Sequence, residues 1–253
     1  MQEAIAKADT LIEALGWIRR FRDKVTVIKL GGSLMESPDS LLHVLLDIVF
    51  METVGMRPVV VHGGGAAISR AMDAAGIQPH FIQGRRYTDQ RSLEIVERVL
   101  AHDINEALSR RIEELGGRAM SLNFRSTCVL YGRRAQLTDD VGQPIDLGHV
   151  GEVTRVDQGL LEKLCQAGLI PVIPSMCWDE NGQKLNVNAD TAAMAVAEAL
   201  GAEKLVFLSD VPGVLRDKND SGSLVHTLGA GEARRLIQQG VVGERLMPAL
   251  QWT

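Results

Sequence analysis

Apolar positions along this chain switch repeatedly between helical and strand spacing. From residue 8 they recur at helical intervals and run into Arg19 and Arg20, which predicts an amphipathic helix with a basic end. A β-branched run over residues 25–30 then stops at a glycine pair, as expected of a buried strand that feeds a tight turn. Residues 41–54 follow as a second predicted helix.

The same unit of strand, glycine turn and helix occurs a second time. Residues 58–61 are an apolar strand, three glycines follow His62, and residues 66–75 form the next predicted helix. Strands that alternate with helices in this way indicate parallel βαβ units. We therefore predict an α/β protein.

Weaker signals of the same kind continue along the rest of the chain. The predicted helices cover residues 92–115, 160–167 and 191–200, the predicted strands cover residues 119–122, 127–130, 169–173 and 204–208, and residues 148–156 have the pattern of a hairpin. No linker of biased composition separates the two halves, so we expect one continuous architecture that divides near residue 175.

Composition narrows the classes of protein that fit. The chain has 253 residues, 45% hydrophobic and 23% charged, with a net charge of −5, which is typical of a globular protein and disfavours a nucleic-acid partner. The widely spaced Cys128, Cys165 and Cys177 disfavour a disulfide framework and a structural zinc site. No window has the length and hydropathy of a membrane span and no leader pattern is present, so we expect a cytoplasmic protein with no membrane partner.

The two glycine turns are candidate anion sites. Backbone N–H groups of Gly31 and Gly32, and of residues 63–65, can approach a phosphate closely, and the helix after each turn adds the positive end of its dipole. Either turn alone also fits a tight strand-to-helix connection without a ligand. Neither has the spacing of a Walker A loop or a dinucleotide fingerprint, and the chain has no GxSxG nucleophile elbow, so a kinase is favoured over a hydrolase.

Three charged side chains have positions that suit chemistry at such a site. Lys29 ends a strand and could bridge phosphoryl oxygens, although a lysine there is often only solvated. Asp190 precedes a helix and could orient lysines or a metal ion, or simply cap that helix. Arg86 has a planar fork suited to a carboxylate, although surface arginines are common. Residues 210–215 form a turn after a strand, where ligands often bind in α/β sheets.

In combination, several segments resemble the amino acid kinase family, and within it the acetylglutamate kinases, over nearly the whole chain. They occur in the order that the family has, which makes chance a poor explanation. The segments are residues 28–33, 60–65, 84–88, 148–153, 185–191 and 208–213.

The resemblance implies a three-layer αβα sandwich with a largely parallel central sheet and two lobes. Residues 1–24 would form an N-terminal helix, residues 25–175 a lobe for acetylglutamate binding and dimerisation, and residues 176–253 a lobe for ATP. The implied reaction is ATP-dependent phosphorylation of the side-chain carboxylate of N-acetyl-L-glutamate in arginine biosynthesis, with Mg²⁺ bridging the nucleotide phosphates.

The resemblance also implies roles for individual residues. Lys29 would stabilise the transferring phosphoryl group, and Asp190 would organise the catalytic lysines. The implied substrate contacts are Gly64, Gly65, Arg86 and Asn186, with Arg86 on the α-carboxylate. The implied nucleotide contacts are Gly31, Gly32, Asp210, Val211, Pro212, Gly213, Val214 and Leu215. No residue is assigned as a dedicated metal ligand.

The N-terminal helix bears on assembly. Residues 11–22 resemble the extra helix of the arginine-inhibited members, where it interlaces between dimers in a hexameric ring. We therefore expect a homo-oligomer, either a dimer or a hexamer. The alternative is that the helix packs on the core of its own chain.

The C-terminal region departs from the family pattern. Family members carry a lysine there that helps hold the nucleotide phosphates, whereas this chain has no lysine after Lys218, with Arg245 close to the corresponding position. Losing such a contact typically costs about 10²-fold in rate. The alternative function is therefore an impaired relative that binds nucleotide, amino acid or a partner subunit without turnover. Family members continue with a further helix and strand, so we also expect reduced stability or compensation by a partner subunit, because a strand of the C-terminal lobe would lose its neighbour.

Overall fold

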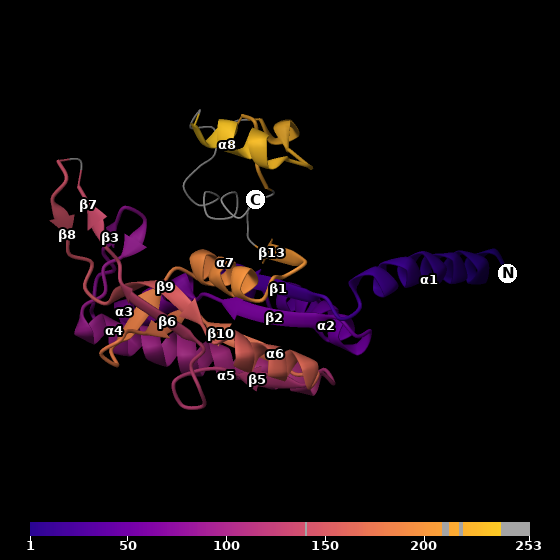
Figure 1. Ribbon diagram of the computed structural model, residues 1–253, viewed down its shortest axis with the longest axis horizontal. Coiled ribbons are helices and arrows are strands. Elements are labelled where there is room, and N and C mark those ends of the chain that lie inside the picture. The colour runs from indigo at the N-terminus through magenta and orange to yellow at the C-terminus, as the bar shows by residue number, and fades with distance from the viewer. Residues whose placement is uncertain (140, 209–212, 218–219, 239–253) are drawn as a thin grey trace.

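The computed structural model describes residues 1–139, 141–208, 213–217 and 220–238 (Figure 1). Its centre is a five-stranded sheet in the order β13-β1-β2-β10-β5, in which every neighbouring pair is parallel. The strands are β1 Val25–Leu30, β2 Arg57–His62, β5 Ala119–Ser121, β10 Ile170–Pro174 and β13 Lys204–Leu208. These strands lie where the apolar runs predicted them, and their parallel order brings their carboxyl ends to one edge.

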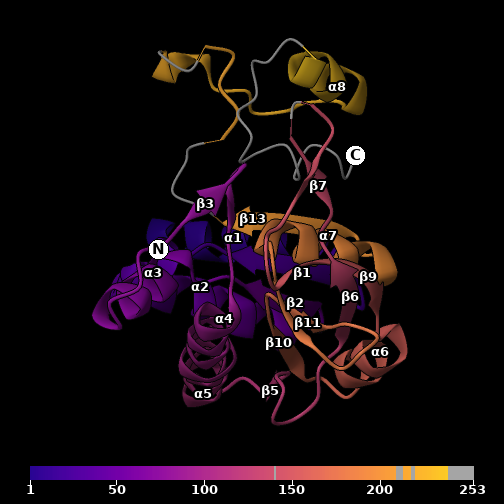
Figure 2. The same ribbon diagram turned by 90° about the vertical axis from the view of Figure 1, so that its left-hand side faces the viewer.

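Helices cover both faces of this sheet, with α2 and α5 on one side and α6 and α7 on the other (Figure 2). Val27 and Val59 point into the layer of α6 and α7, whereas Ile28 and Val60 point into the layer of α2 and α5. Because both faces are covered, the strands are continuous apolar runs. The helices are α2 Pro38–Thr53, α5 Asn105–Glu114, α6 Gln158–Gln166 and α7 Ala189–Ala199. The predicted α/β fold with a parallel central sheet is confirmed.

A small closed barrel in the order β11-β12-β9-β6 adjoins the sheet. Its strands are β6 Leu130–Arg134, β9 Val150–Val156, β11 Met176–Trp178 and β12 Lys184–Val187. The hairpin predicted over residues 148–156 is wrong, because β9 is a single strand there and pairs antiparallel with the distant β6. The strand predicted over residues 127–130 is wrong in its bounds, because Cys128 and Val129 are apolar core residues that precede β6.

The helix predicted over residues 92–115 is one continuous helical stretch made of three segments. They are α4 Gln90–Glu97, η2 Arg98–Ile104 and α5 Asn105–Glu114. The middle segment, η2, is a π-helix, whose turns are wider than those of an α-helix. Such segments often occur at functional sites, and this one lies beside the second glycine turn.

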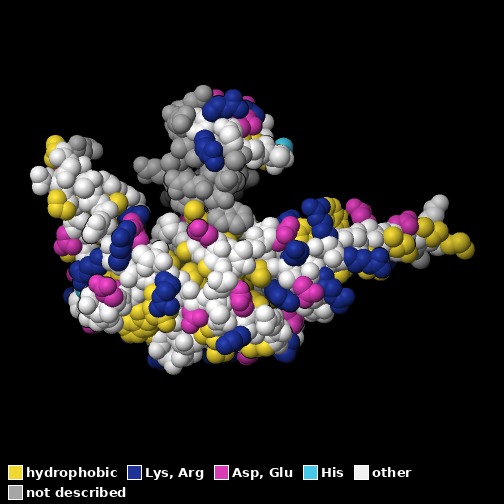
Figure 3. Space-filling model, viewed as in Figure 1, with side chains coloured by type: hydrophobic (Ala, Val, Ile, Leu, Met, Phe, Trp, Pro, Cys, Tyr) yellow, Lys and Arg dark blue, Asp and Glu magenta, His cyan; other side chains and the backbone are white. Residues whose placement is uncertain are grey.

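The N-terminal helix α1 Gln2–Phe21 projects from the body of the molecule (Figure 1). Leu11 and Ile12 are 71% and 69% exposed, whereas Phe21 at its end is buried. Hydrophobic side chains are visible along this helix in Figure 3. The predicted helix is confirmed, but the alternative that it packs on its own core is wrong.

The remaining elements are short or lie toward the C-terminus. They are η1 Leu34–Glu36, α3 Gly65–Ala74, β3 Phe81–Ile82, β4 Arg85–Arg86, β7 Leu137–Thr138, β8 Pro144–Ile145, η3 Ser221–Ser223 and α8 Ala230–Gln238. Arg245 lies outside the described residues. The expected effects of the C-terminal region on rate and stability concern the same part of the chain. Across the described ranges, no helix combines the length and hydropathy needed to cross a bilayer.

Candidate active site

The two predicted glycine turns lie against each other at the carboxyl edge of the central sheet. The Gly31 N–H donates to the carbonyl oxygen of Leu208 (3.0 Å), and the Gly63 N–H donates to that of the last residue of β1 (3.3 Å). A Cβ atom on Gly32 would lie 3.5 Å from the backbone nitrogen of Gly65. The backbones of the two βα units are therefore in close proximity, with room for little more than a Cβ atom between them.

The second turn begins helix α3 and packs on η2. Gly64 is the N-cap residue of α3, which starts at Gly65. A Cβ atom on Gly64 would lie 2.6 Å from Cδ1 of Ile104 and 2.7 Å from Cδ2 of Leu100. The first N–H groups of a helix have no acceptor within the helix and carry the positive end of its dipole. This turn is therefore suited to an anion.

A pocket of about 190 Å³ opens beside this turn. It brings together all the residues that were expected to contact a substrate, namely Gly64, Gly65, Arg86 and Asn186. Sequence reasoning missed other wall residues, among them Phe81 and Arg85 of the β3–β4 hairpin, Ser175 after β10, and Asn188 before α7. Ser175 belongs to no recognised motif, whereas Asn188 could have been found as a helix cap in the segment 185–191.

Arg86 carries a buried positive charge into the wall of this pocket. Its side chain is 8% exposed, and Nη2 donates to Ser69 Oγ (2.8 Å) and to the carbonyl oxygen of Gly65 (3.1 Å). The ring of Phe81 lies over the guanidinium, 4.7 Å away. Burial lowers the pKa of Arg86, and the nearby Asp73 opposes that shift. Within the described ranges no carboxylate forms an ion pair with this guanidinium, so it can receive one from a ligand.

Thr88 links Arg86 to Asn186, which both belong to the wall of the pocket. The buried Thr88 hydroxyl donates to the carbonyl oxygen of Arg86 (2.9 Å) and accepts from Nδ2 of Asn186 (3.3 Å). Gly148, at φ +68°, lies so close to Thr88 that a Cβ atom would be 2.2 Å from its carbonyl oxygen. The segments 84–88, 148–153 and 185–191 therefore meet at one junction.

Lys29 and Asp190 form an ion pair near the glycine turns. Lys29 Nζ lies 2.8 Å from Asp190 Oδ1, and the two side chains are 14% and 23% exposed. The interpretation of Lys29 as only solvated therefore does not hold. The capping interpretation of Asp190 is also wrong, because Asn188 caps α7 by accepting from the backbone N–H groups of Asp190 (2.8 Å) and Thr191 (3.1 Å).

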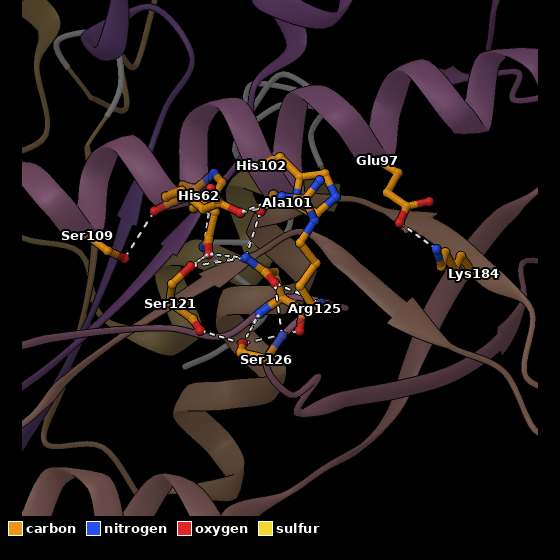
Figure 4. Close-up of polar contacts among 12 residues, drawn as sticks. His62, Glu97, Ala101, His102, Ser109, Ser121, Arg125, Ser126 and Lys184 are labelled. Atoms are coloured by element: carbon orange, nitrogen blue, oxygen red, sulfur yellow. Dashed lines mark hydrogen bonds and ion pairs between the residues drawn. The ribbon is translucent and has the colours of Figure 1, made fainter.

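A buried polar network lies under the second turn and was not predicted from the sequence (Figure 4). His62 is fully buried, and its Nε2 lies 3.0 Å from Nδ2 of Asn105. Asn105 Oδ1 accepts from Ser121 and from Asn123 Nδ2 (3.4 Å). Burial lowers the pKa of His62 to about 4. The network joins residues from three separate segments, and no motif connects them along the chain.

The structure describes part of the expected nucleotide site. Gly31 and Gly32 form the first glycine turn, whereas Asp210, Val211 and Pro212 lie outside the described residues. Gly213 has φ +132°, and the carbonyl oxygen of Val214 accepts from the N–H of Val225 (2.8 Å). Leu215 forms a β-bridge with Leu224. Their expected contact with a nucleotide stays a prediction.

Comparison with known proteins gives consistent results. A sequence model of the amino acid kinase family matches residues 24–251. The chain is 40% identical to an acetylglutamate kinase of Heliobacterium modesticaldum, over 98% of this chain and 85% of that protein, and 42% identical to an acetylglutamate kinase of Synechocystis sp., over 98% and 81%. Its structure superposes on N-acetylglutamate synthase from Neisseria gonorrhoeae, complexed with coenzyme A and N-acetyl-glutamate, with a TM-score of 0.79 and 27% identity, over 97% of this chain and 54% of that one. This chain belongs to the amino acid kinase family.

Proposed function

We propose that this protein is an acetylglutamate kinase, which transfers the γ-phosphoryl group of ATP to the side-chain carboxylate of N-acetyl-L-glutamate in arginine biosynthesis. The identity of 40% and 42% to acetylglutamate kinases over 98% of the chain carries the proposal. The pocket supports it, because it combines a buried guanidinium with a helix N-terminus and an amide side chain, which suit an acidic amino acid derivative.

Binding of the acceptor uses the wall of the pocket. Arg86 pairs with the α-carboxylate through the guanidinium donors that its protein contacts leave available. Asn186, held by Thr88, contacts another part of the amino acid, and Gly64 and Gly65 contact it through the backbone. These contacts hold the side-chain carboxylate in place for an in-line attack.

Phosphoryl transfer forms one bond and breaks one bond. An oxygen of the side-chain carboxylate attacks the γ-phosphorus, and the bond to the bridging oxygen breaks with its electron pair leaving on ADP. Lys29 stabilises the charge on the transferring group, and Asp190 fixes the position of the Lys29 ammonium. Gly31 and Gly32, with residues 210–215, surround the nucleotide. The acylphosphate forms without a covalent enzyme intermediate.

A magnesium ion fits this site when it is bound together with the phosphates of the nucleotide. The described residues contain no group of three or more His, Cys, Asp and Glu side chains that could enclose a metal. Kinases hold magnesium through one or two carboxylates, the phosphates and water, and Asp190 is the carboxylate of this site that would contact the hydrated ion. When bound, the ion neutralises charge on the β- and γ-phosphate oxygens.

Assembly and compartment belong to the same proposal. The exposed apolar side chains of α1 support a homo-oligomer, either a dimer or a hexamer in which α1 joins dimers. The three cysteines are free and buried, which suits the reducing cytoplasm. We assign the lobes to residues 25–175 and 176–253, although β13 of the second pairs with β1 of the first.

Trapping of the acylphosphate with hydroxylamine tests the reaction. The purified chain is incubated with ATP, magnesium and N-acetylglutamate, beside a Lys29→Ala variant. Hydroxamate that depends on all three components and is lost in the variant supports the kinase. A folded chain that binds N-acetylglutamate or ATP in a calorimeter but forms no hydroxamate would instead be the impaired relative.

A further inference from the structure

His62 occupies an unusual position between the central sheet and the pocket. It is the last residue of β2, and the three glycines that follow it line the pocket. Its Nδ1 lies 3.0 Å from the carbonyl oxygen of Gly63, and its Nε2 lies 3.0 Å from Nδ2 of Asn105. Both ring nitrogens are thus engaged inside the protein, and at 0% exposure the ring cannot itself touch a ligand.

Asn105 determines which ring nitrogen of His62 carries the proton. Its Oδ1 is occupied as an acceptor for Ser121 and Asn123, and its Nδ2 donates to the carbonyl oxygen of Val172 (2.9 Å). The amide group therefore presents a donor to His62 Nε2, which must accept. The proton is consequently on Nδ1, which donates to the carbonyl oxygen of Gly63.

This hydrogen bond orients the carbonyl group of Gly63, for which no other donor is found among the described residues. Three consecutive glycines have wide conformational freedom, so the sequence of the turn does not orient its own peptide groups. A trans peptide is planar, and its C=O and N–H point in opposite directions. When the carbonyl of Gly63 points inward to His62, the N–H of Gly64 must point away from the buried network.

We propose that His62 and Asn105 are positioning residues, which lock the peptide between Gly63 and Gly64 so that the Gly64 N–H donates to the reacting carboxylate of the acceptor. The inference rests on the proposed kinase function for the identity of that carboxylate. The lock itself rests on the contacts of His62 and Asn105 in the ligand-free chain. A network that served only to satisfy buried polar groups would stabilise the fold without affecting one substrate more than the other.

Two substitutions of His62 each keep one of its two contacts, with the Gly63 carbonyl or with Asn105, and remove the other. The amide nitrogen of asparagine is attached to Cγ and can take the place of Nδ1, so His62→Asn keeps a donor for the Gly63 carbonyl. The amide of glutamine reaches the place of Nε2, so His62→Gln keeps the contact with Asn105 and loses that donor. Each variant removes one contact of the buried network and keeps the other, so the two differ in which contact is lost.

The glutamine variant should lose catalytic efficiency toward N-acetylglutamate without weaker use of ATP. H62Q should lower kcat/KM for N-acetylglutamate by roughly 10²-fold, the typical effect of losing one positioned donor, and leave KM for ATP unchanged. H62N should recover most of that loss. Equal losses in both variants, or a loss that affects ATP and N-acetylglutamate alike, would overturn the proposal.

A measurement without turnover separates this proposal from the proposed function. Nitrogen-15 spectra of the histidine rings in the ligand-free protein, with His62 assigned from its absence in H62N, should show the neutral form protonated at Nδ1. The form protonated at Nε2 would overturn the lock even in an active kinase. If wild-type protein gives no hydroxamate, the proposed function fails, and the spectrum still decides the lock.

Discussion

The surroundings of Arg86 and Asp190 depend on residues that are distant from them in the sequence. Local sequence leaves Arg86 as an ordinary surface arginine and Asp190 as a helix cap, yet Arg86 is buried in a pocket wall and Asp190 pairs with Lys29. Asn188 performs the capping instead. Both side chains obtain their surroundings from segments that are distant in the sequence, so spacing alone could not distinguish their functional and structural interpretations.

Replacement of Arg86 tests its role in binding the acceptor. Arg86→Ala should raise KM for N-acetylglutamate by about 10- to 100-fold, because the α-carboxylate loses charge-assisted hydrogen bonds. KM for ATP should change little, since Arg86 lines the pocket that we propose for the acceptor. Initial rates with each substrate varied in turn measure both constants. Arg91→Ala, which removes an exposed arginine, is the matched control, and an equal rise in both KM values would contradict the role.

The neutral state of His62 predicts how stability depends on pH. Its pKa is about 4 in the folded chain against 6.5 for an unperturbed histidine, so the unfolded chain binds a proton first as the pH falls. The stability from the neutral ring is present above pH 6.5 and is lost progressively toward pH 4. Between pH 7.5 and 5 the free energy of unfolding should fall by about 2 kcal/mol more in wild type than in H62N. Urea titrations at the two pH values measure this difference, and identical falls would refute the prediction.

At the scale of secondary-structure elements, the strands of the central sheet were predicted well from the sequence. The strands β1, β2, β10 and β13 are covered by helices on both faces, so each is a continuous apolar run that is readily identified. The π-helical turns of η2 were not predicted, because a segment of seven residues is too short for its apolar spacing to distinguish π from α turns. Cys128 and Val129 were predicted to lie in a strand because they are apolar. They are buried in the core without being part of a strand, so their apolar character reflects burial and not strand pairing.

Gly148 lies just before the barrel strand β9 and contacts Thr88, which links Arg86 to Asn186, and this junction can be tested. Gly148→Ala would place a Cβ atom 2.2 Å from the carbonyl oxygen of Thr88 at a backbone φ of +68°. We expect the free energy of unfolding to fall by about 2 kcal/mol or more. Gly182→Ala has a similar φ of +72° with open space around it, and should cost about 1 kcal/mol. Denaturant titration of both variants separates the clash from the backbone strain, and equal losses would argue against a tight junction.

At the scale of the whole molecule, α1 has an apolar surface that the described residues of its own chain leave exposed. The exposed apolar side chains of α1 include Leu11, Leu15 and Trp17, which are 71%, 43% and 54% exposed. Single exposed apolar residues are common, whereas several of them along one projecting helix favour the homo-oligomer that we propose. The sequence predicted the helix and its apolar spacing, but spacing cannot say whether the same chain or another one buries that face.

A double substitution tests whether another chain covers this face of α1. Leu11→Asp with Leu15→Asp should convert the oligomer into a smaller species, because two charges would be buried in the contact between chains. The melting temperature of the smaller species should stay close to that of wild type, since neither leucine packs on the body of its own chain. Sedimentation velocity measures the assembly, with Glu13→Gln on the same exposed helix as the control. If the double variant keeps the wild-type mass, the contact between chains lies elsewhere, and α1 is a surface that the protein leaves uncovered.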